Sequence, residues 1–163
     1  MPLTLTIDRQ LWHTHHRALL DDAPGLVPVA KGNGYGFGLR LLAAEATRLR
    51  VKTLAVGIAQ EVAAVRAGGF AGDVVVLNPW RPFDDAATSL LDDPLVVTTV
   101  SRAEDLRALA TTHPGARVIV EVETSMHRHG LDPRELTDRD FGGLTFEGWA
   151  THLPASGPLE EAK

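Results

Sequence analysis

Short runs rich in β-branched and other apolar residues recur along the chain, and most of the segments between them have helical character. The runs are Val27–Lys31, Thr53–Gly57, Val74–Asn78, Leu95–Val100, Val118–Val122 and Phe146–His152. This alternation is typical of repeated βα units that build a parallel sheet. The sequence therefore predicts an α/β fold of about six βα units. The alternation alone leaves open whether the sheet is doubly wound or part of a closed (β/α)8 TIM-type barrel.

Apolar residues at helical spacing and local stop signals mark the segments that connect these runs. Predicted helices cover Leu39–Leu49, Gln60–Gly68 and a segment that begins near Asp8. Ser101, followed three residues later by Glu104, predicts a capping box that opens another helix through Leu109. The final stretch GPLEEAK, residues 157–163, begins like a helix and has no stop signal.

The composition favours one compact domain and excludes several classes of protein. The chain has 163 residues, 44% of them hydrophobic, which is enough to bury a core. Its net charge of -5 is dispersed, with no basic stripe, so nucleic acid is not an expected partner. Cysteine is absent, which excludes disulfides and thiolate chemistry. We find no apolar window long enough to span a membrane and no export signal, and we expect a cytoplasmic protein.

Lys31 stands at the end of the first predicted strand and is followed by glycine at every second position through Gly38. In parallel α/β folds the functional face lies at the carboxyl ends of the strands. A primary amine placed there can condense with an aldehyde, and the small residues after it let a bulky group approach the backbone. The alternative is a surface lysine before a flexible loop. The glycine spacing fits neither a dinucleotide-binding nor a Walker motif.

Several histidine and tryptophan residues could bind a metal or a ligand, but structural roles explain them better. His13, His15 and His16 form a group that invites a metal site, but a solvated helix face is the better interpretation because no third ligand is near in sequence. Trp12, Trp80 and Trp149 lie among apolar neighbours and are predicted to pack rather than to stack on a ligand. No metal site is predicted.

The stretch Val29–Gly38, read VAKGNGYGFG, closely resembles the lysine motif of the alanine racemases, which are fold-type III pyridoxal-phosphate enzymes. The resemblance implies that Lys31 forms a Schiff base with pyridoxal 5'-phosphate and acts as one of two catalytic bases. It also implies that Tyr35 contacts the cofactor phosphate. Phe37 stands where the family usually has histidine. The resemblance selects the barrel over the doubly wound sheet.

Two later stretches resemble the same family in the same order. Glu123–Gly130 is similar to the family pattern Asp-Thr-Gly-Met-x-Arg-x-Gly, which implies that Arg128 lies beside the cofactor ring oxygen and the substrate carboxylate. Trp149–Leu153 resembles the family's Thr-His-Phe segment, and it implies that His152 stacks on the pyridine ring.

Glu121 occupies a position where alanine racemases often carry a carbamylated lysine that holds the arginine. A carboxylate supplies the same negative charge, so the resemblance implies an ion pair between Glu121 and Arg128. The alternative is that Glu121 and Glu123 share one solvated face of a strand.

The resemblance implies a pyridoxal-phosphate-dependent amino-acid racemase that interconverts L- and D-alanine or a related amino acid. Residues 1–163 correspond to an incomplete, N-terminal part of the barrel, while the last strands and a β-domain are absent. In the family the second base is a tyrosine from the β-domain of the partner subunit in a homodimer. We therefore expect a small amino-acid substrate and little activity from this chain alone. The alternative is a non-catalytic module that binds pyridoxal phosphate or a protein.

Overall fold

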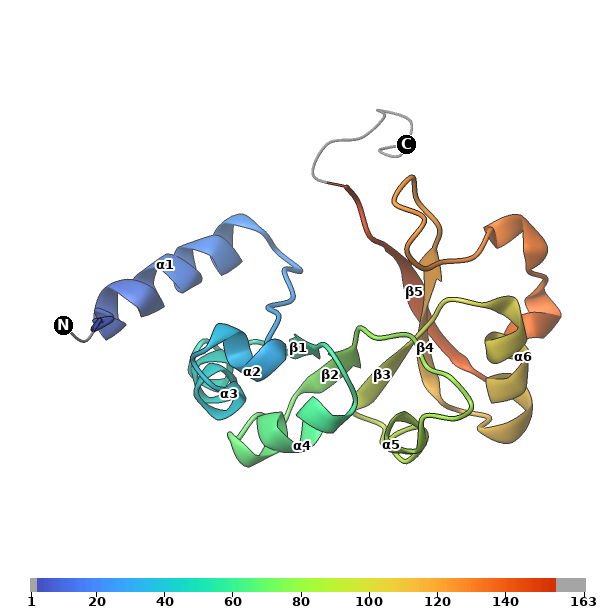
Figure 1. Cartoon of the computed structure of the whole chain (residues 1–163), viewed down its shortest axis with the longest axis horizontal. Helices are drawn as coiled ribbons and strands as arrows, with labels where there is room; N and C mark the ends of the chain where they lie inside the picture. The colour runs from blue at the N-terminus through green and yellow to red at the C-terminus, as the bar shows by residue number, and fades with distance from the viewer. Residues whose placement is uncertain (1–2, 155–163) are drawn as a thin grey trace.

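The computed structural model describes residues 3–154, which form one parallel sheet with helices packed against it (Figure 1). The strands are β1 Thr53–Val56, β2 Asp73–Val76, β3 Val96–Val100, β4 Arg117–Val122 and β5 Thr145–Thr151. The helices are α1 Arg9–Asp22, α2 Gly32–Tyr35, α3 Leu39–Arg48, α4 Gln60–Ala67, α5 Asp85–Thr88 and α6 Ala103–Thr112. Every adjacent pair of strands is parallel, in the order β1-β2-β3-β4-β5. The helical start predicted at residues 157–163 lies outside the described residues.

The first predicted strand, Val27–Lys31, is reduced to a single bridge. Val29 pairs with Ala55 in parallel, and the amide of Ala30 donates to the Ala55 carbonyl at 2.8 Å. Pro28 has no amide hydrogen, so it can accept from the Ala55 amide but cannot donate to β1. The prediction of a regular strand here is wrong, although the segment still lies alongside the sheet.

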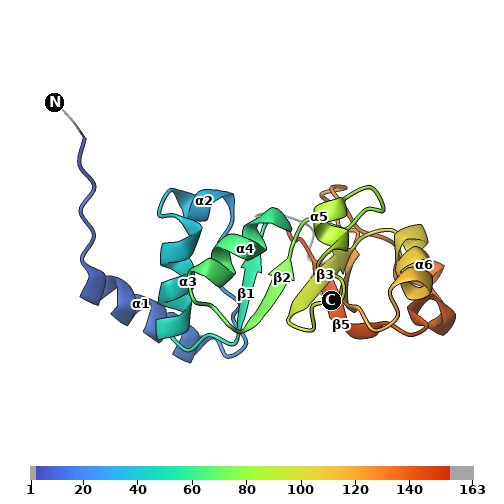
Figure 2. The same ribbon diagram turned by 90° about the horizontal axis from the view of Figure 1, so that it is seen from below.

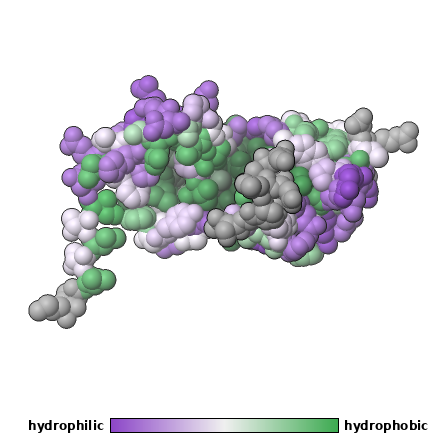
Figure 3. Space-filling view, turned by 90° about the horizontal axis from the view of Figure 1, so that it is seen from above, coloured by the Kyte–Doolittle hydropathy of each residue, from purple (hydrophilic) through white to green (hydrophobic). Residues whose placement is uncertain are grey.

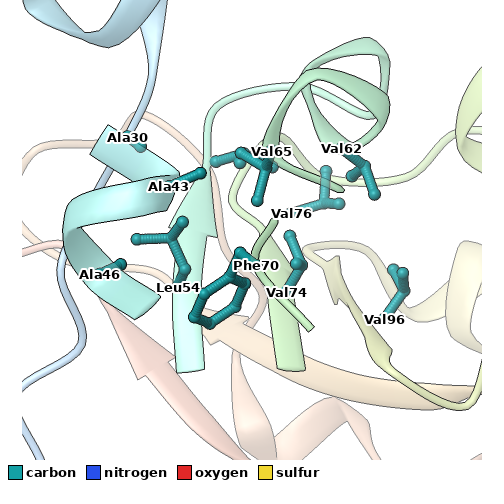
Figure 4. Close-up of a cluster of buried hydrophobic side chains, with 11 residues drawn as sticks. Ala30, Ala43, Ala46, Leu54, Val62, Val65, Phe70, Val74, Val76 and Val96 are labelled. Carbon is teal, nitrogen blue, oxygen red and sulfur yellow. The ribbon is translucent and has the colours of Figure 1, made fainter. Parts of the chain in front are cut away.

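Helices α3 and α4 pack on the same side of β1 and β2. The buried side chains of the two helices include Ala43, Ala46, Val62 and Val65. They meet alternate side chains of the strands, which point to one face because the side-chain period of a strand is two residues. Figure 4 shows this cluster, in which Leu54, Val56, Val74, Val76 and Val96 come from the strands.

Helices α5 and α6 continue the same layer over β3 and β4. The second cluster joins Ala87, Leu106 and Leu109 of these helices to strand side chains. The strand members are Val100, Val118 and Val120. Val96 of the first cluster and Val100 of the second lie four residues apart on β3 and so point to the same face, which means that both clusters use one face of the sheet. The predicted crossover helices are thereby confirmed.

Strand order and helix placement together decide between the two parallel architectures. A doubly wound sheet reverses its strand order at a switch point and carries helices on both faces. Here the order is sequential, and α3 to α6 lie on one face, as in consecutive units of a barrel wall. The structure thus confirms the prediction of a partial barrel-type α/β fold.

The capping box predicted at Ser101 is wrong. Helix α6 has Arg102 at its N-cap, with no hydrogen bond from a capping side chain. The buried hydroxyl of Ser101 instead accepts a hydrogen bond from Arg81 Nη2 at 3.2 Å. Asp105, in the first turn, accepts from Arg81 Nη1 at 3.0 Å and from Arg102 Nε at 2.7 Å. Two arginines therefore donate hydrogen bonds to the Asp105 carboxylate, whose negative charge interacts favourably with the N-terminal end of the helix dipole.

Helix α1 begins as predicted and lies at one end of the molecule (Figure 2). The Asp8 carboxylate caps it by accepting from the amides of Gln10 and Leu11, each at 2.9 Å. No residue of α1 is buried. Within residues 3–154, no helix combines the length and the apolar character needed to cross a bilayer.

Strand β5 is the least covered strand of the sheet. Two short 3-10 helices, Pro133–Glu135 and Asp138–Phe141, precede it in place of a full crossover helix. The rings of Phe146 and Trp149 lie 5.2 Å apart in an edge-to-face arrangement, and Trp149 is 50% exposed. Trp149 packs on an aromatic neighbour as predicted, but at the surface rather than in the core.

Candidate functional site

A cleft of about 180 Å³ lies at the carboxyl ends of the strands. It is lined by Lys31, Gly57, Leu77, Asn78, Thr99, Ile119, Glu121, Arg128, Ala150, Thr151 and His152. Four of the five predicted site residues are among them, namely Lys31, Glu121, Arg128 and His152. Lys31 is far from the other three in the sequence, and the carboxyl ends of parallel strands bring them to one edge of the sheet. Tyr35 does not line this cleft.

The glycine-rich stretch after Lys31 folds back in the left-handed region of backbone space. The φ angles are +57° at Gly32, +56° at Asn33, +61° at Gly34 and +55° at Tyr35, and they remain positive at Gly36. Residues with a Cβ atom pay about 1–2 kcal/mol for this conformation, whereas glycine does not. The glycines thus lower the free-energy cost of the turn that follows Lys31, in which Asn33 and Tyr35 adopt the same conformation.

Tyr35 and Phe37 point to a second, apolar cavity rather than to the cleft. This cavity has a volume of about 330 Å³ and is lined in part by Trp12, Tyr35, Phe37 and Leu42. The Tyr35 side chain is 60% exposed. The rings of Trp12 and Phe37 meet edge to face at 5.2 Å, so Phe37 helps to hold α1. Figure 3 shows a hollowed and largely apolar area on one face of the molecule.

Arg128 lies against His152. Nη1 of Arg128 is 3.3 Å from Nδ1 and 3.4 Å from Nε2 of the imidazole. A position nearly equidistant from both ring nitrogens is over the face of the ring, because an approach in the ring plane would clash with the carbon between them. Nη1 of the guanidinium therefore lies over the face of the imidazole. Thr124 holds this end of β5 by donating to the His152 carbonyl at 2.8 Å.

The predicted ion pair between Glu121 and Arg128 is not formed. Glu121 is 5% exposed, and its Oε2 atom has no hydrogen-bond partner among the described residues. Strand β4 aims it into the cleft, in register with Ala150 of β5. Arg128 instead lies in an exposed loop beyond the strand and contacts His152. The buried Glu121 also rules out the alternative in which this residue belongs to a solvated face.

Three polar residues near the cleft were missed by the sequence interpretation. Asn78 follows β2 and lines the cleft, and Thr99 lines it from β3 while donating to the Val76 carbonyl at 2.6 Å. Their position at strand ends was the signal that could have revealed them. The third is Glu61, whose carboxylate accepts from the amide of Gly32, next to Lys31, at 2.7 Å. No local sequence pattern signals that bond, because it joins segments 29 residues apart.

The histidines near the N-terminus do not assemble a metal site in the described part of the chain. Within residues 3–154 no group of three or more histidine, aspartate or glutamate side chains is placed to hold a metal ion. Nδ1 of His13 lies 2.7 Å from Oε1 of Glu45, and Nδ1 of His16 lies 2.8 Å from the Trp12 carbonyl. His13 thus joins α1 to α3.

The donor set of the cleft suits a flat, anionic aldehyde. Lys31 offers a primary amine, and Arg128 offers a guanidinium with free N–H groups beside an imidazole face. The unpartnered Oε2 of Glu121 is a buried acceptor that needs a donor or a cation. A bound group with a hydrogen-bond donor would therefore satisfy the buried carboxylate. A donor side chain that moves toward Glu121 when the group binds would do the same.

Comparisons with known proteins agree with this geometry. The family model described as "Alanine racemase, N-terminal domain" matches residues 9–163. An alanine racemase of Desulfovibrio desulfuricans is 29% identical over 154 residues, which cover 90% of this chain and 41% of that protein. An amino-acid racemase of Enterococcus faecalis is 27% identical over 148 residues, covering 89% of this chain and 21% of that protein.

The fold matches solved structures to a similar extent. The crystal structure of alanine racemase from E. faecalis superposes with a TM-score of 0.76 at 24% sequence identity. The match covers 91% of this chain and 43% of that one. This chain therefore spans less than half the length of the relatives that it matches.

Proposed function

The chain belongs to the alanine racemase family, whose N-terminal domain it matches, and we propose that it forms the part of a pyridoxal-phosphate site that carries the lysine in an amino-acid racemase. The observation that supports this proposal best is the convergence of Lys31, Arg128 and His152 on one cleft. Alanine is the proposed substrate, because relatives named alanine racemase match most of this chain.

Each of the converging residues has a proposed part in holding the cofactor. Pyridoxal phosphate supplies an aldehyde that condenses with a primary amine, with loss of water, and a ring that draws electrons from the carbon bonded to that nitrogen. Nζ of Lys31 would provide that amine. The imidazole face of His152 that Arg128 leaves free would support the ring, and the guanidinium of Arg128 would bind the substrate carboxylate through paired N–H donors.

Lys31 would also move the proton on which racemisation depends. An amine released by an incoming amino acid is free to accept the Cα proton at Nζ, and it can return that proton to the same face only. Inversion therefore requires a second base on the opposite face. Tyr35 is the one tyrosine of the 163-residue chain, and it does not line the cleft. We propose that the second base comes from another segment or subunit.

The proposed active assembly is larger than residues 1–163. We propose a cytoplasmic homodimer in which the partner completes the cleft, in line with the need for a second base. Tyr35 as a ligand of the cofactor phosphate stays a prediction, and it would require the side chain to turn from the apolar cavity toward the cleft. The Tyr35→Phe variant tests that role, because loss of the hydroxyl should weaken cofactor binding.

A labelling experiment tests the cofactor site directly. The chain is mixed with pyridoxal phosphate, reduced with borohydride, digested and mapped by mass spectrometry. Lys31, Lys52 and Lys163 are the lysines of the sequence, so the label has few places to go. We expect it on Lys31, and we expect the Lys31→Arg variant to lose it while Lys52→Arg keeps it. A label that avoids Lys31 would end the proposal.

A second experiment separates catalysis from binding alone. The chain is combined with a polypeptide that carries the C-terminal half of a relative, and Cα–H exchange of L-alanine is followed in deuterium oxide. Exchange that depends on Lys31 supports a racemase. Labelling of Lys31 without exchange in the completed assembly would favour the non-catalytic binding module.

A further inference from the structure

The carboxylate of Glu61 ties together three segments around the cleft lysine. Its Oε1 atom accepts from the Gly32 amide at 2.7 Å, and its Oε2 atom accepts from the amides of Gly57 at 2.7 Å and Ile58 at 3.2 Å. Gly32 follows Lys31 directly, while Gly57 and Ile58 form the turn between β1 and α4. Hydrogen bonds to an ionised acceptor are short and strong, so this set is a firm connection.

Together with a bond to β1, the bonds of Glu61 hold the backbone on both sides of Lys31. On its N-terminal side, the Ala30 amide donates to the Ala55 carbonyl of β1 at 2.8 Å. On its C-terminal side, the Gly32 amide donates to Glu61. Beyond Gly32 the chain enters the left-handed turn, where the glycines are intrinsically flexible. Without Glu61, the C-terminal side of Lys31 would keep the longer bond from the Tyr35 amide to the Lys31 carbonyl, at 3.3 Å, but would lose its tie to the β1–α4 turn.

The absence of a side chain at Gly57 makes this arrangement possible. A Cβ atom added at Gly57 would lie 3.1 Å from Oε2 of Glu61 and 3.1 Å from Cβ of Lys31. Few Cβ atoms tolerate contacts this short, so Gly57 leaves the space in which the lysine and the carboxylate pass each other.

A purely local role for Glu61 does not account for the contact with Gly32. Glu61 lies in the first turn of α4, and its bonds to Gly57 and Ile58 resemble those of any acidic residue at a helix N-terminus. The second oxygen, however, reaches a residue 29 positions earlier in the chain. Helix capping requires no such bond.

We propose that Glu61 is a positioning residue, which sets the direction from which the Lys31 amine enters the cleft. The proposal rests on the proposed function, because the position of Lys31 matters only if its amine reacts. Both oxygens are needed, one for the lysine segment and one for the β1–α4 turn. The effect of substitution should therefore follow the number of acceptors that remain.

The test compares Glu61→Gln and Glu61→Ala with the wild-type chain. Glutamine keeps one acceptor oxygen and alanine keeps none. The rate of borohydride-trapped labelling at Lys31 by pyridoxal phosphate should fall in the order Glu, Gln, Ala, with a loss of about 10- to 100-fold for alanine, as expected for a displaced reacting group. Labelling of Lys52 in the same molecules is the internal reference. Glu104→Gln, an exposed glutamate in the first turn of α6, is the matched control.

The ratio of Lys31 to Lys52 labelling corrects for reagent and reaction time, and urea denaturation of each variant shows whether a lowered ratio comes from a folded chain with a displaced lysine or from unfolding. A wild-type chain that does not label at Lys31 would refute the proposed function itself. A wild-type chain that labels, together with Glu61 variants that label at the same rate and ratio, would overturn the positioning role. If the variants do not fold, amide hydrogen exchange in the wild type decides the question. The Gly32 amide should be protected, and rapid exchange at Gly32 would refute the proposal.

Discussion

Nη1 of Arg128 lies 3.3 Å from Nδ1 and 3.4 Å from Nε2 of His152, so a guanidinium nitrogen lies over the imidazole face of the residue that directly follows β5. The contact joins two of the residues that line the cleft with Lys31. It gives the cleft a planar, cationic wall, on which a flat anionic group can lie with its edges toward N–H donors.

Replacing Arg128 with lysine keeps the charge and removes the planar group. We expect the dissociation constant for pyridoxal phosphate to rise, because a lysine cannot stack on His152 or offer paired donors. Stacked cationic contacts contribute about 0.5–2 kcal/mol, which corresponds to roughly a 2- to 30-fold change. Absorbance titration measures the constant. Arg134→Lys, which lies outside the cleft and pairs with Asp132, is the control, and equal affinity of both variants would contradict the prediction.

Glu121→Gln should raise the stability of the chain without cofactor. The carboxylate is buried and its Oε2 atom is unpartnered, and a neutral amide of the same shape costs less free energy to bury. We expect the free energy of unfolding to increase by about 1 kcal/mol. Urea denaturation at neutral pH measures it. Glu123→Gln, two residues later with its carboxylate exposed, should leave it unchanged, and a destabilised Glu121→Gln would refute the interpretation.

Two alanine substitutions in the left-handed turn separate backbone strain from steric clash. Gly32→Ala introduces a Cβ at a φ of +57° with no atom within 4 Å, so it should cost about 1–2 kcal/mol. Gly34→Ala adds the same strain at +61° and places its Cβ 3.1 Å from the Leu39 amide nitrogen. We expect a further cost of about 1–3 kcal/mol. Thermal and urea denaturation measure both, and equal destabilisation would contradict the assigned clash.

Acid should weaken the sheet through Asp73. Arg117 hydrogen bonds to this carboxylate at 2.9 and 3.1 Å and lowers the pKa of Asp73 from its ordinary value. A lowered pKa in the folded state means that protonation favours the unfolded chain. The stabilisation is present in full above the ordinary pKa of about 3.9, and it is lost as the pH falls through the lower pKa of the folded state.

Asp73→Asn should therefore reduce the dependence of the unfolding free energy on pH below about pH 4. The exposed Asp92→Asn variant is the control. Urea denaturation across the acidic range measures both, and identical pH profiles for Asp73→Asn and the wild type would show that the pair with Arg117 contributes nothing.

The elements of the fold could be predicted where the pattern is local. The strands β1 to β5 lie within one or two residues of the predicted apolar runs, since a short run of β-branched residues is a signal that depends only on near neighbours. One of the failures has a local cause and the other a distant one. Pro28 removes a donor from the first strand, and Ser101 gives its hydroxyl to a distant arginine rather than to its own helix.

For the candidate site, the sequence also predicted what depends on local signals and missed what depends on distant contacts. Lys31, Glu121, Arg128 and His152 each follow or end a predicted strand, and parallel strands bring such residues to one cleft. The partners of these residues could not be predicted. Glu121 was expected to pair with Arg128, yet the loop carries Arg128 onto His152 and leaves Glu121 without a partner at Oε2. Tyr35 was expected at the cleft and lies in the turn facing the apolar cavity.

By itself, the sequence determined the alternation of strands and helices and the glycine-rich turn that directly follows Lys31, because these depend on near neighbours along the chain. Only the tertiary structure decided that α3 to α6 lie on one face and that Glu61 holds the residue after Lys31. The physical reason is that a crossover helix chooses its face of the sheet, and a side chain its partner, through contacts between distant segments. The order of residues along a strand does not specify those contacts.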